Sequence, residues 1–439
     1  MDKHVYAERR ARFFEVIGQG VAVIPSAPVH LRNGDVEHDY RQDSDFFYLT
    51  GFDEPESVLV LVGAGAAGQE AAPKAVLFVR EKDPERELWD GARAGTEGAV
   101  ERFGAQEAFP IGELGKRLPD LLTDVRTVFY RLGHYRDFDG VLMEAVAEVR
   151  KRARRGVCAP AVFVDSADFL HEARLFKSTD ELEAIVAAGA ITRKAHVKAM
   201  EVARPGRFEY EVEAELLHVF RQGGAERAAY GSIVGSGPNA TVLHYRSNNR
   251  CMQDGDLLLI DAGAELNYYA SDVTRTFPVA GKFTPPQRRL YDLVLQAQVA
   301  SIEAVRPGAT LQDIHDASVQ VLTEGLIALG IIAGPLDKAL EEKRYLPYYM
   351  HKTSHFLGMD VHDVGNYYLD GKPRPLQPGM VLTVEPGLYV AEKSEAPEEY
   401  RGIGIRIEDD IAVTDHGYRN LTPDIPKEAT EIESLLANR

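Results

Sequence analysis

Cysteine is scarce in this sequence, with only Cys158 and Cys251 among 439 residues and no Cys-x-x-Cys pair. Two distant cysteines without this spacing do not indicate a structural zinc site built on thiolates, and they favour reduced thiols in the cytoplasm over a disulfide framework. No uninterrupted apolar run approaches about 18 residues, so we expect no membrane span. The first residues, MDKHVYAERRARFF, are charged and lack the apolar stretch of a secretory leader. No Gly-x-Ser-x-Gly pattern occurs, which disfavours a serine hydrolase.

Positive charge is also in the minority, because 50 Lys and Arg face 68 Asp and Glu and leave a net charge of -18. We therefore expect no nucleic-acid partner. The basic run from Arg150 to Arg155 ends a predicted helix, where cations favour the helix dipole, and we interpret it as a solvent-exposed face. The segment GAGAAG at residues 63–68 matches a dinucleotide-binding fingerprint, but an apolar run from Ala75 follows it instead of a helix. We interpret these glycines as a connection between strands.

The length of the chain predicts two domains, because it exceeds what one hydrophobic core usually serves. In residues 1–172, helical patterns alternate with the expected strands VAVIP, FFYLTGF, SVLVLV, AVLFV and TVFYRL, which is typical of an α/β domain with a mixed sheet. Residues 173–439 are expected to form the second domain. The connection is expected within residues 165–177. Ser178 or Thr179, followed by acidic residues, is expected to start the first long helix of the second domain. The fold class is therefore α/β (α+β).

Acidic residues in the second half follow apolar runs that read as core strands. Asp261 follows Leu257–Ile260 and Glu385 follows Val381–Val384, and neither run contains Lys or Arg. Further strand-like segments contain Asp272, His355 and Glu408. Buried carboxylates must be paired or must coordinate metals, because an isolated buried charge costs many kcal/mol. The pattern predicts a pair of divalent cations.

The second half also repeats internally. Helical patterns end in Arg-Pro-Gly at residues 204–206 and 306–308, and each is followed by another amphipathic stretch. Gly255 precedes Asp261 by six positions, and Gly379 precedes Glu385 by the same spacing. Two similar α/β halves related by a pseudo-twofold axis would bring acids from both halves to one place.

At this point a family resemblance can be stated. The segments HYRSN, IDAGAELNYYASDVTRTFPV, SHFLGMDVHDVG, VLTVEPGLYV and YRGIGIRIEDDI resemble the pita-bread metallopeptidases, and most closely the bacterial Xaa-Pro aminopeptidases, also called aminopeptidase P. The segment DYRQDSDFFYLTGFDEPESVLVLV resembles the N-terminal domain of that family, so the resemblance covers nearly the whole chain. One departure is Lys352, which follows His351 where the family usually has glycine. It alters one wall of the site and leaves the motif residues His355 and Gly358 in place.

The resemblance implies a dinuclear aminopeptidase that hydrolyses the first bond of peptides with proline at the second position, using a hydroxide that bridges the metals. Manganese is the favoured metal, and Co(II), Zn(II) or Fe(II) suit the same oxygen and imidazole donors. Glu385 would be both a ligand and the shuttle that passes a proton to the departing proline nitrogen. The implied metal ligands are Asp261, Asp272, His355, Glu385 and Glu408.

Other residues gain roles from the same resemblance. His244 would lie beside the substrate, and His362 would donate a hydrogen bond to the substrate or the tetrahedral intermediate. Arg406 would either balance the charge of the acids or orient the substrate. The remaining implied substrate-binding residues are His351, Tyr389 and Trp89, and Trp89 would act on a neighbouring subunit of a homodimer or homotetramer. His351 and His355 have zincin spacing, but no glutamate lies between them.

Three alternatives remain at this stage. A prolidase, restricted to Xaa-Pro dipeptides, would share the same architecture. A methionine aminopeptidase is disfavoured by the long N-terminal domain. A non-catalytic binding module on the same scaffold is the third, although such modules lose metal ligands and this sequence keeps all five.

Overall fold

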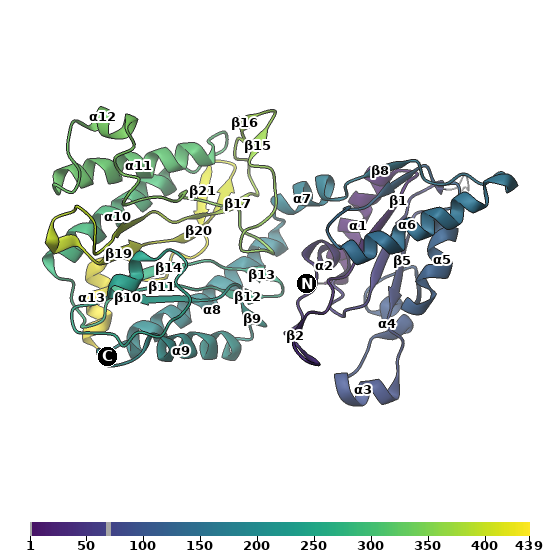
Figure 1. The fold of residues 1–439 in the computed structure, drawn as a ribbon, viewed down its shortest axis with the longest axis horizontal. Coiled ribbons are helices and arrows are strands. Elements are labelled where there is room, and N and C mark those ends of the chain that lie inside the picture. The colour runs from purple at the N-terminus through teal and green to yellow at the C-terminus, as the bar shows by residue number, and fades with distance from the viewer. Residues whose placement is uncertain (1, 67–71) are drawn as a thin grey trace. The chain divides into compact units, whose positions relative to one another are not determined.

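The computed structural model describes residues 2–66 and 72–439. The chain divides into two compact units, Met1–Ala173 and Arg174–Arg439 (Figure 1). The first unit is built around a six-stranded mixed sheet of order β6-β5-β4-β1-β7-β8. Its strands are β1 (Val21–Pro25), β4 (Val58–Val62), β5 (Lys74–Val79), β6 (Glu107–Pro110), β7 (Thr127–Phe129) and β8 (Val162–Val164).

The side chains of these strands point alternately to the two faces of the sheet, and both faces are buried under helices. Val21 and Val23 of β1 pack in one core with Leu118 of α5 (Leu114–Leu121) and Val146 of α6 (Arg136–Lys151). Phe13 of α1 (Lys3–Ile17) contacts Phe129 at the end of β7. The smaller elements of this unit are β2 (Leu31–Asn33), β3 (Val36–Glu37), α2 (Ser44–Thr50), α3 (Pro84–Asp90) and α4 (Gly95–Glu101).

The expected strand FFYLTGF is wrong, because residues 44–50 form helix α2. The Asp43 side chain accepts a hydrogen bond from the Phe46 N–H and caps the start of the helix. Gly51 ends it in the left-handed conformation, with a φ of 63°. All seven helix residues are buried, so the apolar run carries no helical period, and the caps on either side decide the structure.

The glycine-rich segment lies between β4 and β5, which are antiparallel neighbours in the sheet. Gly68 and the rest of residues 67–71 lie outside the described residues. The basic run begins at the end of α6, and Arg152, at the C-terminal cap of that helix, forms an ion pair with Asp120 at 2.6 Å.

The second unit repeats a helix pair followed by a small sheet, in line with the predicted pseudo-twofold repeat. Helix α8 (Thr179–Val202) packs on α9 (Glu209–Gln222), and α10 (Pro285–Glu303) packs on α11 (Leu311–Ala328). The two Arg-Pro-Gly segments connect the helices of each pair. Of the two predicted helix-start residues, Ser178 is the cap of α8, through a capping box with Glu181, and Thr179 is the first residue of the helix. Shorter helices are α7 (Ala167–Leu175), which crosses the boundary between the units, α12 (Leu336–Glu341) and α13 (Ala429–Ala437).

Two three-stranded sheets follow these helix pairs, and the predicted acids lie at their ends. The order is β10-β11-β14 in one sheet and β17-β20-β21 in the other. Gly255 and Gly379 have φ values of 84° and 93°, so the equivalent turns before β11 and β17 both use the freedom of glycine. The strands are β9 (Arg227–Ala228), β10 (Ile233–Ser236), β11 (Leu257–Asp261), β12 (Ala264–Leu266), β13 (Tyr269–Ala270), β14 (Thr274–Pro278), β15 (Tyr368–Leu369), β16 (Lys372–Pro373), β17 (Val381–Val384), β18 (Gly387–Val390), β19 (Ile403–Arg406), β20 (Asp409–Thr414) and β21 (Gly417–Asn420).

The expectation that every candidate ligand lies on a strand is only partly right. Asp261 is the last residue of β11, Glu385 follows β17 directly, and Glu408 lies between β19 and β20. His355 is in a non-strand segment, where its neighbour Phe356 makes one isolated bridge to Leu382. Within the described part of the chain, no helix combines the length and apolar character that a bilayer span requires.

Candidate metal centre

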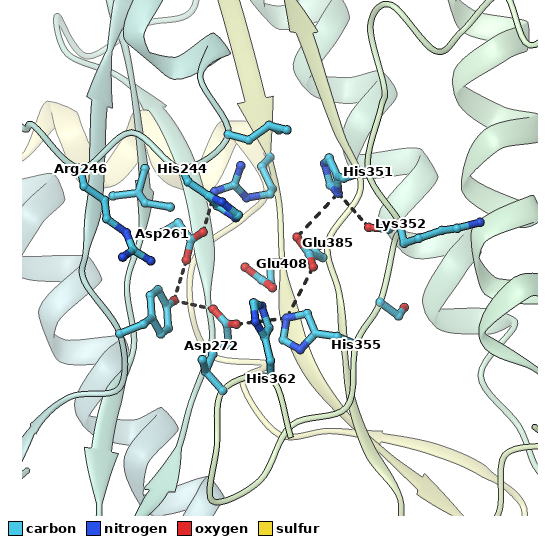
Figure 2. Close-up of a pocket in the computed structure, with 16 residues that line it drawn as sticks. His244, Arg246, Asp261, Asp272, His351, Lys352, His355, His362, Glu385 and Glu408 are labelled. Carbon is cyan, nitrogen blue, oxygen red and sulfur yellow. Dashed lines mark hydrogen bonds and ion pairs between the residues drawn. The ribbon is translucent and has the colours of Figure 1, made fainter. Parts of the chain in front are cut away.

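A cavity of about 360 Å³ lies in the second unit, and the predicted acids and histidines line it from both halves of the repeat (Figure 2). Asp261 and Asp272 belong to the first half, whereas His355, Glu385 and Glu408 belong to the second. The lining residues are Tyr230, Ile233, Leu243, His244, Arg246, Asp261, Asp272, His351, Lys352, Ser354, His355, Val361, His362, Glu385, Arg406 and Glu408. All five residues predicted as ligands therefore face one space.

Three of these residues converge closely. One potential ligand atom from each of Asp272, His355 and Glu408 lies within 4.8 Å of the others. The His355 Nε2 atom is 3.4 Å from Asp272 Oδ2 and 3.6 Å from Glu385 Oε1. Asp261 joins the group through the Tyr230 hydroxyl, which donates to both Asp261 Oδ1, at 2.6 Å, and Asp272 Oδ1.

The backbone fixes which nitrogen of His355 faces the acids. Its Nδ1 atom lies 3.0 Å from the Phe356 carbonyl oxygen. That oxygen can only accept, so Nδ1 bears a hydrogen and Nε2 points toward the carboxylates. Metal-binding histidines commonly use one ring nitrogen for the metal and donate from the other to a carbonyl or carboxylate. His355 therefore has the orientation of a metal ligand.

The crowding of acids is visible in their pKa values. Burial raises the pKa of Glu385 to about 8, although His355 and Arg406 oppose the shift. Burial and the neighbouring Asp272 raise the pKa of Glu408 well above its usual value, and burial raises that of Asp261 against the opposing charge of Arg406. Burial lowers the pKa of His355, but its hydrogen bond to Asp272 and the nearby acids outweigh this effect and raise the pKa to about 9.

These shifts and the donor set fit divalent cations. Carboxylates that hold protons because they are buried, and because other carboxylates lie beside them, would be stabilised in their charged form by positive charge placed between them. Four carboxyl groups and one imidazole form a set of hard oxygen donors with a single nitrogen, which suits Mn(II), Co(II), Fe(II) or Zn(II). The residues present therefore fit a metal centre of the kind that the sequence predicts.

Family models match both units of the chain. The model for metallopeptidase family M24 matches residues 183–415, and the model for the aminopeptidase P N-terminal domain matches residues 6–130. The Xaa-Pro aminopeptidase of Escherichia coli strain K12 is 45% identical over 437 residues, which covers 99% of this chain and 98% of that protein. The chain belongs to metallopeptidase family M24.

Solved structures agree with this assignment to M24 over the full length. The aminopeptidase PepP of Pseudomonas aeruginosa is 48% identical, has a TM-score of 0.97, and is matched over 100% of this chain and 98% of that chain. A zinc-substituted aminopeptidase P of Escherichia coli, in complex with product, is 44% identical with a TM-score of 0.97, over 100% of this chain and 99% of that chain. The fold is therefore that of the aminopeptidase P structures, and the chain is a metal-dependent hydrolase of the M24 type.

Arg406 and His351 form a hydrogen-bonded chain behind the acids of this M24 site. Arg406 donates from Nη2 to Asp261 Oδ2 at 2.6 Å and from Nη1 to the Tyr389 hydroxyl at 3.0 Å. The Tyr389 hydroxyl lies 2.9 Å from His351 Nε2, and His351 Nδ1 lies 2.8 Å from the Lys352 carbonyl oxygen. Since that carbonyl only accepts, His351 donates from Nδ1, and Nε2 accepts from the tyrosine. Burial and the charge of Arg406 lower the pKa of His351 to about 3, so this imidazole stays neutral.

The residues predicted to bind substrate differ in whether they line the cavity. His244 and His362 are exposed side chains that line it, and the rings of His355 and His362 lie 4.5 Å apart. Tyr389 was expected to line substrate space, but it is only 2% exposed and does not line the cavity, because it lies behind His351. Trp89 lies on α3 of the first unit and is 87% exposed.

Lys352 stands where the family usually has glycine. The Lys352 side chain extends away from Glu385, and its Nζ atom donates to Gln312 Oε1 at 3.2 Å (Figure 2). The ammonium group is therefore held toward α11, although Lys352 is one of the residues that line the cavity.

Sequence reasoning missed several residues that support the ligands. Thr274 Oγ1 donates to Glu408 Oε2 at 2.6 Å, and Asp410 accepts from the Asp272 N–H at 3.2 Å. The role of Thr274 could have been predicted from the sequence, because it lies two residues after Asp272 in an extended segment and so points to the same face. No sequence pattern indicated Tyr230, since its contacts with Asp261 and Asp272 join positions 31 and 42 residues away in the sequence.

Proposed function

We propose that this M24 chain is an Xaa-Pro aminopeptidase, which removes the first residue from peptides that have proline at the second position. The main support is the single cavity lined by five oxygen and nitrogen donors from both halves of the repeat. The curated relatives from Escherichia coli and Haemophilus influenzae, 45% and 41% identical over 99% of this chain, are named Xaa-Pro aminopeptidases. The full-length match, including the N-terminal domain, favours this activity over that of a prolidase.

In this proposal Asp261, Asp272, His355, Glu385 and Glu408 hold two divalent cations, with manganese as the favoured metal. When bound, the cations would acidify water and polarise the scissile carbonyl group. Tyr230, Thr274 and Asp410 keep the ligand carboxylates and backbone in place through their hydrogen bonds.

Glu385 is the proposed proton shuttle. Its carboxyl group lies in the cavity, with Oε1 3.6 Å from His355 Nε2. A carboxylate within reach of the attacking water can accept a proton from it and later release that proton. Glu385 would take the proton of the attacking water and pass it to the nitrogen of the departing proline, which must gain a proton to leave as an amine.

The histidines orient the peptide around this shuttle. His244 and His362 present imidazole N–H groups to the cavity, where they would donate to the substrate carbonyl oxygen and to the negative charge that develops on it. Arg406 serves mainly to balance charge in this scheme, because its guanidinium group is committed to Asp261, Tyr389 and Thr274.

Proline specificity would follow from a cavity wall that does not depend on a hydrogen bond from an N–H group of the substrate. The Xaa-Pro bond is a tertiary amide without N–H, so a site for proline needs apolar contact with the ring and no acceptor for a missing hydrogen. Ile233, Leu243 and Val361 supply apolar lining. His351 is neutral and already bonded at both nitrogens, and its ring can therefore pack against the proline.

The first unit would serve oligomerisation and substrate access in a homodimer or homotetramer. Leu88 and Trp89 of α3 are 85% and 87% exposed, which is unusual for adjacent large apolar residues and supports a partner copy at this helix. Trp89 would then border the substrate site of that copy. Cys158 and Cys251 are both free thiols, which supports a reducing compartment such as the cytoplasm.

A substrate series tests the proposed function. The metal-loaded protein is assayed on an Xaa-Pro dipeptide, on longer peptides with the same first two residues, and on matched peptides in which alanine replaces proline. We expect release of the first residue from the longer proline peptides and little turnover of the alanine peptides. Cleavage restricted to dipeptides would make the protein a prolidase, and efficient cleavage of the alanine peptides would overturn the proposed specificity.

A further inference from the structure

A cluster of buried charges lies behind the cavity wall that contains His355 and His362. Lys177 Nζ donates to Asp363 Oδ2 at 2.9 Å, and Arg174 Nη2 donates to Asp363 Oδ1 at 2.7 Å. Arg174 also donates to Asp360 Oδ2 at 2.7 Å. The side chains of Lys177 and Asp363 are each 1% exposed, and that of Arg174 is 3% exposed. No residue of this cluster lines the cavity.

The stability of the fold does not by itself explain this cluster. Replacing a buried ion pair with apolar residues of similar size is often neutral or stabilising, because burying charge is costly. Buried ionic groups are in some proteins retained because they specify one arrangement of the chain. Here both oxygens of Asp363 have a cationic partner, and Lys177 and Arg174 lower the pKa of Asp363 despite its burial.

The backbone next to the cluster makes a tight loop between the two histidines. The Asp363 N–H donates to the Phe356 carbonyl at 2.9 Å, and the Gly358 N–H donates to the Asp360 carbonyl at 3.2 Å. A Cβ atom on Gly358 would lie 2.1 Å from Asp363 Oδ2 and 2.8 Å from Lys177 Cε. The Asp363 carboxylate therefore packs directly against the loop, and only glycine at position 358 leaves room for it.

The position of the His362 side chain depends on this loop. Among the described residues, His362 has no hydrogen-bond partner, although its ring packs edge-on against that of His355. An imidazole without hydrogen bonds to fix it is placed by its backbone, and the adjacent residue Asp363 anchors that backbone. The anchor is firm because Lys177 directly precedes the cap of α8, and its own N–H donates to the Gly379 carbonyl at 2.8 Å.

We propose that Asp363, clamped by Lys177 and Arg174, is a positioning residue for His362 in the peptidase reaction. This inference rests on the proposed function, since it assigns His362 a role in the turnover of substrate. Asp363, Lys177 and Arg174 do not line the cavity, so they would touch neither substrate nor metal. They act through the loop at residues 356–363 and hold the imidazole where it can donate to the reacting carbonyl group.

A double-mutant cycle tests the coupling. Lys177→Met keeps most of the side-chain stem and removes the charge, and it is combined with His362→Ala. Misplacing a catalytic group by about 1 Å can cost 10²-fold, so we expect Lys177→Met to lower kcat by about 10- to 100-fold with little change in KM. In the His362→Ala background the same change should have no further effect on kcat. Equal losses in both backgrounds would overturn the inference.

Matched variants separate positioning from general damage. Lys198→Met removes a partly exposed lysine of α8 that pairs with Glu201, and it should leave kcat unchanged. Lys177→Arg should recover part of the activity, because it restores a cation to Asp363. If Lys177→Met does not fold, the cycle is run with the paired apolar variant Lys177→Met/Asp363→Leu, and metal content is measured for every protein.

A crystal structure distinguishes failure of this inference from failure of the proposed function. In the Lys177→Met protein we expect the loop at residues 356–363 to shift together with His362, a result that does not require activity. An unmoved loop would overturn the inference even if the enzyme cleaves Xaa-Pro peptides. A wild-type protein without activity on any such peptide would overturn the proposed function, while the movement of the loop would still test the coupling.

Discussion

Binding of metal to this site should release protons, because protons and cations compete for the same donor atoms. The perturbation is the addition of Mn²⁺ to protein from which metal has been removed. Burial raises the pKa of Glu385 to about 8, and the nearby acids raise that of His355 to about 9 despite burial. Metal ligands must be deprotonated, so both groups must lose their protons on binding.

The size of the effect follows from these values. At pH 7 Glu385 is roughly nine-tenths protonated and His355 almost fully so, which gives about two protons released per chain. The raised pKa values of Glu408 and Asp261 can only add to this number. Each released proton changes the apparent binding constant about tenfold per pH unit, so the overall constant for both ions should rise at least about 100-fold from pH 6 to pH 7.

Calorimetry measures this release directly. Titrations in buffers of different ionisation enthalpy give the number of protons exchanged at each pH. His355→Ala should release about one proton fewer, whereas His218→Ala, which changes an exposed residue of α9, should behave as wild type. Tight Mn²⁺ binding at pH 7 with no proton release would refute the reasoning, since it would mean that the metal binds elsewhere or that the acids are already ionised.

Three further predictions concern the same site. Glu385→Ala should lower kcat on an Xaa-Pro peptide by at least about 10³-fold while circular dichroism shows a retained fold, and undiminished turnover would contradict the shuttle role. Tyr230→Phe should weaken Mn²⁺ binding by about 10- to 100-fold because Asp261 and Asp272 lose a shared donor, and calorimetry showing unchanged affinity would remove that role. In thermal melts, metal-free wild-type protein should lose stability relative to metal-free Glu385→Gln protein as pH rises from about 5 to 8, because the folded wild-type state holds a proton on Glu385 that the unfolded chain has already lost; a stability difference that does not change with pH would contradict the raised pKa.

The parts of the fold that were predicted correctly depend on residues that lie close together in the sequence. Ser178 and Glu181 lie three residues apart and cap the same helix, so their pattern is readable without the structure. The acids at Asp261 and Glu385 follow apolar runs and turn glycines, which is why both were placed at strand ends. The helix at residues 44–50 was missed because all its residues are buried and its signal lies in the flanking Asp43 and Gly51.

Other features depend on contacts between distant parts of the chain. Lys177 and Asp363 are 186 residues apart, and neither has a local pattern that points to the other. Asp410 accepts from the backbone of Asp272 across 138 residues, and only the packing of the two halves brings them together. The resemblance to a family gave the ligand set, whereas the supporting hydrogen bonds needed the structure.

The most direct test of the dinuclear site is anomalous diffraction from crystals grown with Mn²⁺. The account predicts two anomalous peaks per chain, about 3.5 to 4 Å apart, between Asp261, Asp272, His355, Glu385 and Glu408. A single peak would contradict the dinuclear centre, and peaks bound by other residues would contradict the assignment of these five side chains as ligands.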